Sequence, residues 1–309
     1  MTPQPKSQKL SGVQRQVAKC YSTWGKSYFD EYYRSPSAYP PVHFKIVKQE
    51  LKKHRVRDVL DAGCGPASML RGLREWKARR FGFDLTLEMV EEARRILARQ
   101  GVPSDNIWQG SVLEPSSYRR LGEDKSVRFA SVICFGVLPH IPEELDGRVF
   151  ALLRKSLKPG GLALVEARNG LFSLFTCNRY SYRFLIDRLI CLKKNKGNTN
   201  ETFKLQKLIR KLKNHFRMDL PPIRRGKRGE PGYDEVLSRL HNPLVAARQF
   251  AQAGFTNVET LFYHYHCLPP MFEDEAPIFF RKQSLRMENP RDWRGHFMAS
   301  AFILKGIAA

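Results

Sequence analysis

Hydrophobic positions between about Val56 and Glu166 follow two different periods. Short apolar runs predict strands at 59–61, 80–84, 106–108, 129–135 and 162–166. Apolar residues at helical spacing predict helices at 87–100, which ends at Gly101, and at 149–157. Strands that alternate with helices in this way predict a parallel sheet covered by helices on both faces.

The pattern changes after this region. Residues 168–240 are rich in Lys and Arg and are predicted to be mainly helical. A helix at 244–253 and strands at 258–266 and 296–307 follow, and a proline-containing loop at 268–295 joins the two strands. We expect these two strands to pair antiparallel at one edge of the sheet.

The composition is that of a globular protein with no membrane span. Apolar residues make up 42% of the 309 positions, and no stretch reaches the roughly 18 uninterrupted apolar residues that a spanning helix needs. The six cysteines form no CxxC pair, and the first residues lack the apolar core of a signal peptide. We therefore expect a cytoplasmic protein with neither a metal site nor a disulfide framework.

The positive charge is concentrated in one part of the chain. The net charge is +23, from 53 Lys and Arg against 30 Asp and Glu. Residues 168–248 contain 19 of these basic side chains and only 6 acidic ones. A polyanionic partner or surface is therefore a hypothesis that involves this segment above all.

The most informative motif is the stretch DAGCGPA at 61–67, where a predicted strand enters a glycine turn. Such a turn lets a ligand approach the backbone near the carboxyl ends of the strands. Asp84 ends the next strand, and a carboxylate there can accept both hydroxyls of a ribose. Asp61 would be unfavourable beside a pyrophosphate, so the turn favours a ligand that has an ammonium group and no phosphate.

With these features the chain resembles the class I S-adenosylmethionine-dependent methyltransferases, and most closely those that act on small metabolites and lipids, including ubiquinone-pathway enzymes. The motifs that carry the resemblance are DAGCGPA (61–67), GFD (82–84), VLPHI (137–141), LKPGG (157–161), AGF (253–255) and SAFILKG (300–306). The resemblance implies an α/β, doubly wound, Rossmann-like sheet of seven strands, mostly parallel, whose last strand is reversed. To this fold the chain adds a basic helical insertion.

The resemblance also divides the chain. Residues 1–54 would form an N-terminal helical cap and residues 55–167 the core that binds S-adenosylmethionine. Residues 168–242 would form the basic insertion, which serves as a lid over the acceptor, and residues 243–309 would complete the core with the last two strands.

The cofactor site is implied residue by residue. Around the methionine part of S-adenosylmethionine, the resemblance places Asp61, Gly63 and Gly65, and Cys64 belongs to the same cofactor-binding turn. It places Asp84 at the ribose, Leu85, Ser111, Val112 and Phe135 along the remaining wall, and Tyr21 and Tyr28 in an aromatic cap. Ala67, Ser111 and Ala130 depart from the residues that are usual in the family.

Two residues are candidates for catalysis, His140 and Glu166. His140 follows the fourth strand and is a candidate base, or else shapes the cofactor pocket without moving a proton. Glu166 lies with Arg168 and Asn169 just past the fifth strand, where hydrogen bonds that anchor a loop are the alternative. His264 and His266 alternate along the sixth strand, face one side of the sheet, and are weaker candidates.

Residues 171–191 place Leu171, Tyr182 and Leu189 near one face of a predicted helix and Arg179 and Arg183 on another. Such a helix fits a lid over the active site or a contact with an anionic membrane surface. The loop RRGKR at 224–228 is either a phosphate-binding segment or a solvated charge run.

The expected function is methyl transfer to O or N of a small-molecule, lipid-linked or saccharide-type acceptor. The net charge keeps an RNA methyltransferase open as an alternative, although no NPPY-like tetrad follows the fourth strand. A non-catalytic subunit that retains the fold is the second alternative.

Overall fold

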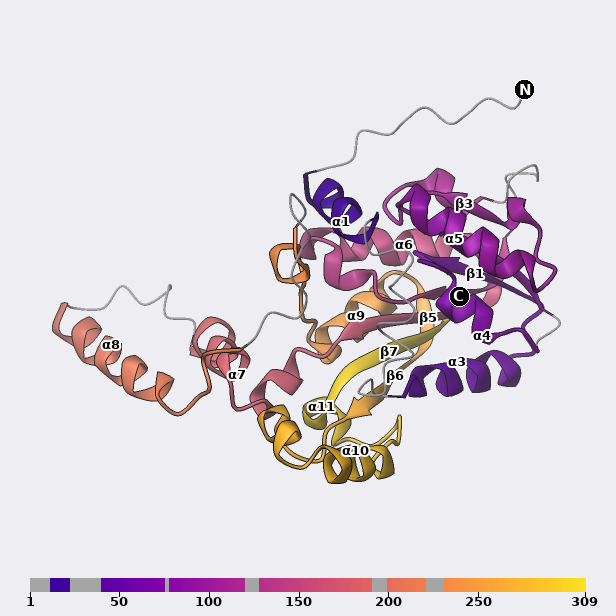
Figure 1. Ribbon diagram of the computed structural model, residues 1–309. Coiled ribbons are helices and arrows are strands. Elements are labelled where there is room, and N and C mark those ends of the chain that lie inside the picture. Colours follow the sequence, from indigo (N-terminus) through magenta and orange to yellow (C-terminus); the bar gives the residue numbers. More distant parts are fainter. Residues whose placement is uncertain (1–11, 23–39, 76–77, 120–127, 191–198, 221–230) are drawn as a thin grey trace.

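The computed structural model describes residues 12–22, 40–75, 78–119, 128–190, 199–220 and 231–309 (Figure 1). At its centre is a seven-stranded sheet with the order β3-β2-β1-β4-β5-β7-β6. Its strands are β1 Asp58–Ala62, β2 Arg79–Asp84, β3 Ile107–Gln109, β4 Phe129–Cys134, β5 Leu157–Arg168, β6 Phe255–Tyr265 and β7 Ala299–Ala308. The seven predicted strands are therefore present.

The strand directions also match the prediction. Strands β1 to β5 pair in parallel, whereas β7 is antiparallel to both of its neighbours, β5 and β6. The chain runs outward from β1 on one side through β2 and on the other through β4, so the strand order reverses beside β1. In open α/β sheets, ligands bind at the carboxyl ends of the strands at this switch point.

Helices cover both faces of the sheet, as predicted. Helices α3 Val42–Lys53, α4 Ser68–Gly72 and α5 Leu87–Ala98 contribute to one apolar core, and α6 Asp146–Ser156 and α9 Pro243–Gln252 contribute to the other. Successive side chains of a strand point to opposite faces, so Val59 enters the first core and Leu60 the second. This two-sided burial explains why the strand sequences are continuous apolar runs.

The loop predicted at 268–295 contains more structure than expected. It includes helix α10 Pro277–Arg286, whose first residue is a proline at a position where a missing N–H costs nothing. The predicted last strand begins three residues late, because α11 Gly295–Met298 precedes β7. The Asn169 amide donates to the carbonyls of Gly295, His296 and Ala299, and this long-range contact holds the turn.

The prediction of one continuous helix over 171–191 was wrong. The structure has a 3-10 helix at Leu171–Phe175, helix α7 at Arg179–Phe184 and a π-helix at Leu185–Ile190. The interruption has a local cause, since Cys177 has a positive φ of 52° and the Asn178 side chain caps α7 by accepting from the Tyr180 amide. Cys191 and the loop at 224–228 lie outside the described residues.

Two further helices flank the core. Helix α1 Gly12–Ser22 lies above the carboxyl ends of the strands, and α8 Thr199–Lys213 extends away from the body (Figure 1). Residues 214–220 and 231–242 contain no α-helix, so the prediction of a mainly helical 168–240 is only partly correct. Among the described residues, no helix is long and apolar enough to cross a membrane.

Candidate functional site

A cavity of about 1690 Å³ lies at the carboxyl ends of the central strands. The predicted site residues within the described ranges all line it: Tyr21, Asp61, Gly63, Cys64, Gly65, Asp84, Leu85, Ser111, Val112, Phe135, His140 and Glu166. Tyr28 lies outside the described residues. The fold therefore brings together residues that the sequence distributes over five strand ends and helix α1.

Two buried carboxylates define one end of the cavity. Burial raises the pKa of Asp61 well above its ordinary value, and the neighbouring charge of Asp84 raises it further. Burial also raises the pKa of Asp84, although hydrogen bonds from the Thr86 and Gly65 amides partly oppose the rise. Two desolvated carboxylates that repel each other are stabilised by a positively charged ligand, so this end of the cavity suits a cation.

Asp84 is held in place by the turns on either side of it. Its Oδ2 accepts from the Gly65 amide at 2.8 Å, and its Oδ1 accepts from the Thr86 amide at 3.1 Å. Oδ1 also accepts from the Thr86 hydroxyl at 3.2 Å. Each carboxylate oxygen has about two acceptor positions, so a ligand hydroxyl can bind Oδ2 directly and reaches Oδ1 only where the Thr86 hydroxyl turns away. The carboxylate thus connects the glycine turn after β1 to the turn after β2.

The glycine turn has little room for side chains. A Cβ on Gly63 would lie 2.3 Å from a methyl group of Val137, and Gly63 has a φ of +83°. Ala67, which stands where the family usually has a third glycine, adopts a left-handed conformation with a φ of 58° at the start of α4. The alanine therefore keeps the backbone geometry of a glycine at this position, at a cost in strain.

The wall opposite this turn is connected to helix α1. Ser111 is buried, and its Oγ accepts from the Gln14 amide group at 2.9 Å and from the Leu113 backbone amide at 3.2 Å. Gln14 also lines the cavity. Ser111 is therefore a residue that docks α1 against the cofactor wall as well as one that faces the cavity.

His140 has a defined tautomer because of its two partners. Its Nδ1 lies 2.6 Å from the Leu237 carbonyl oxygen, which only accepts, so Nδ1 carries the proton. Its Nε2 then accepts from the Tyr21 hydroxyl at 2.9 Å. Burial lowers the pKa of His140 to about 4, so the ring is neutral near pH 7.

Glu166 lies at the centre of a second polar group. Its Oε1 accepts from the Tyr263 hydroxyl and its Oε2 from the Gly136 amide, both at 2.5 Å. The His43 ring lies 5.4 Å from the Tyr263 ring and 6.0 Å from the Phe135 ring, measured between centroids. The carboxylate near the end of β5 is thus held by hydrogen bonds from the loop after β4 and from β6, and His43 packs beside Tyr263.

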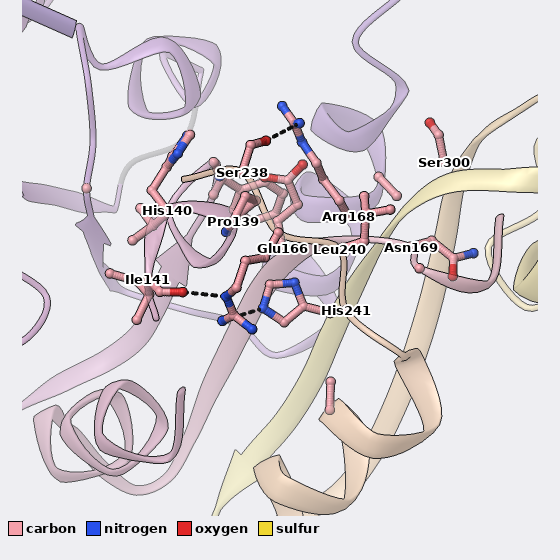
Figure 2. A pocket seen from close by; sticks show the side chains of 18 of the residues that line it. Pro139, His140, Ile141, Glu166, Arg168, Asn169, Ser238, Leu240, His241 and Ser300 are labelled. Atoms are coloured by element: carbon pink, nitrogen blue, oxygen red, sulfur yellow. Dashed lines mark hydrogen bonds between the residues drawn. The ribbon is translucent and has the colours of Figure 1, made fainter. Parts of the chain in front are cut away.

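A buried ionic group supports the loop that carries His140. Arg239 donates to Asp146 Oδ1 at 2.6 Å and to the Ile141 carbonyl at 2.5 Å, and its guanidinium lies 3.2 Å from His241 Nε2. Figure 2 shows Arg168 directed toward Ser238, to which it donates at 2.9 Å. The segment 236–242 therefore forms one wall of the cavity and fixes the loop after β4.

The three weaker candidates from the sequence are Asn169, His264 and His266, and each is buried or makes hydrogen bonds that hold the fold. The Asn169 amide anchors α11, as the loop-anchoring alternative proposed. His264 lies near the end of β6 and His266 directly after it, and their rings stack with centroids 5.1 Å apart. Burial lowers the pKa of His264 to about 3 and that of His266 to about 4, so both rings are neutral near pH 7.

Sequence reasoning missed several lining residues, in particular His43, Tyr263 and Arg239. None of them belongs to a motif that is recognisable in one sequence. The described residues contain no group of three or more His, Cys, Asp or Glu side chains that could hold a metal ion. Burial raises the pKa of the Cys64 thiol well above its ordinary value, which disfavours a thiolate at the turn.

Comparisons with known proteins agree with this geometry. A family model described as a methyltransferase domain matches residues 59–161. The ubiquinone biosynthesis O-methyltransferase of Histophilus somni (strain 2336) is 25% identical over 132 residues, which are 43% of this chain and 53% of that protein. An uncharacterized protein, RP028 of Rickettsia prowazekii (strain Madrid E), is 23% identical over 110 residues, which are 35% of this chain and 41% of that protein. The matches thus span about half the length of these curated relatives.

A solved structure shows the same fold over nearly the whole chain. It is an S-adenosylmethionine-dependent methyltransferase from Clostridium acetobutylicum ATCC 824, with a TM-score of 0.53 and 11% identity. The match covers 93% of this chain and 98% of that one. The strand order and the matched family model together lead to one assignment: residues 59–161 match a methyltransferase domain, and the chain has the fold of an S-adenosylmethionine-dependent methyltransferase.

Proposed function

We propose that this protein transfers a methyl group from S-adenosylmethionine to O or N of a small-molecule, lipid-linked or saccharide-type acceptor. The observation that carries the proposal is the buried pair Asp61 and Asp84 at the switch point of the sheet, where a positively charged ligand would relieve the repulsion between two carboxylates. S-adenosylmethionine has both a sulfonium and an ammonium group and lacks phosphate, so it fits this end of the cavity.

Different residues of the cavity would bind different parts of the cofactor. Asp61 and the turn at Gly63 and Gly65 would hold the methionine part, and Asp84 would accept the two ribose hydroxyls. Leu85, Ser111, Val112 and Phe135 would form the adenine wall, and Tyr21 would cover the cofactor from α1. When bound, S-adenosylmethionine supplies an electrophilic methyl group, so the task left to the protein is to orient an acceptor and accommodate its proton.

Glu166 is our candidate for the group that accepts the proton of the acceptor. Its carboxylate lines the cavity and is fixed by the Tyr263 hydroxyl and the Gly136 amide. An acceptor hydroxyl or amine at this position would donate to Glu166 and present its lone pair toward the cofactor end of the cavity. Tyr263 would keep the carboxylate in the orientation that this requires.

His140 has a different part in the proposal. With Nδ1 protonated and Nε2 accepting from Tyr21, the neutral ring positions the Tyr21 hydroxyl. A histidine whose pKa is lowered to about 4 is a poor proton acceptor near pH 7. We therefore propose that His140 acts on the reaction through Tyr21.

The acceptor end of the cavity supports an amphiphilic molecule. Leu171, Phe172 and Leu174 line it from the 3-10 helix, and Arg179 and Arg183 line it from α7. The curated relative named a ubiquinone biosynthesis O-methyltransferase is consistent with an oxygen acceptor on a lipid-linked molecule. RNA is the second candidate acceptor, and the observation that favours it is the net charge of +23.

Incubation with methyl-labelled S-adenosylmethionine and a whole-cell extract tests the proposal. We expect label in the organic-soluble or small-molecule fraction, and its loss with Glu166→Gln. Label released only by ribonuclease would make RNA the acceptor. Binding of the labelled cofactor without transfer to any fraction would support the non-catalytic alternative instead.

A further inference from the structure

Helix α8, Thr199–Lys213, is strongly amphipathic. Leu205, Leu208, Ile209 and Leu212 recur at spacings of three or four residues and share one face. Lys204, Lys207, Arg210 and Lys211 lie on the opposite side, and Lys213 follows at the end. The 15 residues contain five basic side chains against the single carboxylate of Glu201. A helix of this kind has an apolar stripe bordered by positive charge.

The helix does not use its apolar face in the core of the protein. It extends away from the sheet (Figure 1) and contributes no residue to the cavity, and among the described elements no other helix or strand packs along it. Leu208, in the middle of the apolar face, is 61% exposed, and Leu205 and Ile209 are partly exposed. The stripe is therefore available to a partner outside the described part of the chain.

We propose that α8 docks on an anionic lipid surface. An amphipathic helix with leucine and isoleucine on one face and Lys and Arg on the other lies in the plane of a membrane interface, where its apolar face enters the boundary between headgroups and acyl chains. The basic side chains are then attracted to the negative charge of the lipid headgroups. This proposal does not depend on the proposed function, because α8 contributes no residue to the cavity.

The apolar face decides between lipid and nucleic acid. Lys and Arg alone would bind a phosphate backbone as well as a lipid headgroup. Four aliphatic side chains on one face make no favourable interaction with phosphates. In the acyl region of a membrane they would be removed from water, which is favourable. A membrane surface therefore uses both features of α8, whereas a nucleic acid would use the charge alone.

Co-sedimentation of the full-length protein with lipid vesicles tests the docking. One set of vesicles contains phosphatidylcholine alone, and the other contains phosphatidylcholine with phosphatidylserine. We expect binding to the second set only, weakened by added salt. Leu208→Asn with Ile209→Asn should reduce the affinity by about tenfold or more without changing the charge. Phe203→Asn, which removes an exposed apolar side chain from the opposite side of α8, is the matched control and should bind like the wild type.

Circular dichroism and S-adenosylmethionine binding show whether each variant keeps its fold. Equal binding of the wild type to both sets of vesicles, or to neither, would overturn the proposal. So would unchanged vesicle binding by the variant with both asparagines. If Lys207→Gln with Arg210→Gln reduced RNA binding while the asparagine variant left vesicle binding intact, the surface would be assigned to nucleic acid.

Discussion

The hydroxyl of Tyr21 and Nε2 of His140 lie 2.9 Å apart, although 119 positions separate them in the sequence. Their rings meet edge to face at a centroid distance of 5.4 Å. This contact joins helix α1 to the loop after β4, and both elements line the cavity. The position of the N-terminal helix over the proposed cofactor is therefore coupled to the segment that lies beside the acceptor.

Tyr21→Phe removes the hydroxyl and leaves Nε2 of a buried histidine without this donor. A buried acceptor that loses its partner costs about 1–3 kcal/mol, which corresponds to a factor of about 5 to 150 in affinity or rate. We expect kcat/KM for methyl transfer to fall by a factor in this range. Ser22→Ala, one residue further along, removes an exposed hydroxyl that donates to the Lys19 carbonyl within α1 and should have little effect. Equal kinetics for Tyr21→Phe and the wild type would exclude the coupling.

Glu166→Gln should lower kcat far more than it changes the affinity for S-adenosylmethionine. Removing a general base typically costs about 10²–10⁴ in rate. Tyr263→Phe keeps the carboxylate and removes its orienting donor, so we expect a smaller loss of kcat in the same direction. Steady-state kinetics and titration calorimetry on each variant separate the two effects. A Glu166→Gln enzyme with the kcat of the wild type would assign the proton to another group.

The buried His140 predicts a pH dependence of stability. Burial lowers its pKa from 6.5 to about 4, so the unfolded chain binds a proton over a pH range where the folded protein does not. The free energy of unfolding should therefore fall as the pH drops from 6.5 to about 4, by at most about 3 kcal/mol from this residue. Above pH 6.5 the ring is neutral in both states and contributes no dependence.

Urea unfolding at several pH values in this range measures the effect. Other groups titrate there too, so the comparison is between the wild type and His140→Gln, which cannot take up the proton. The variant should be less stable at neutral pH, because it loses ring contacts, and should show a shallower decline toward acid pH. Parallel stability curves for the two proteins would contradict the assignment.

The parts of the fold that were predicted correctly are those whose signal is local. The strands β1, β2 and β4 are buried on both faces, so each one is a short apolar run that can be recognised without knowing its neighbours. The acidic turn at 61–67 is equally local, and its partner Asp84 ends the next strand. That is why the cofactor side of the site was accessible to sequence reasoning.

The parts that were missed depend on distant contacts. Helix α11 begins where it does because Asn169, more than a hundred residues earlier, holds its carbonyl groups. His43 and Tyr263 join Glu166 only after α3 and β6 have packed on the sheet. The start of a new helix at Asn178 could have been predicted, since asparagine is a frequent helix N-cap. The apolar periodicity on both sides of Cys177 and Asn178 nevertheless indicated one continuous helix.

A buried ion-pair group outside the cavity stabilises the same junction of α3, β6 and β7. Lys305 on β7 lies 3.1 Å from Glu50 of α3 and 2.5 Å from Glu259 of β6, and Arg291 contacts both carboxylates. Lys305→Met leaves the buried Glu50 short of one cation, so we expect the free energy of unfolding to fall by about 3 kcal/mol. Adding Glu50→Gln should restore part of the loss. Lys155→Met on the exposed side of α6 is the control, and an equal effect there would contradict this account.

The central claim is that the acidic turn binds S-adenosylmethionine, and calorimetric titration of the purified protein with this compound tests it most directly. We expect saturable binding by the wild type that is strongly weakened by Asp84→Asn and by Asp61→Asn, with thermal unfolding showing that both variants remain folded. Glu143→Gln changes an exposed carboxylate of the cavity lining that pairs with Arg188, and this variant should bind like the wild type. No binding by the wild type, or undiminished binding by a folded Asp84→Asn variant, would contradict the account.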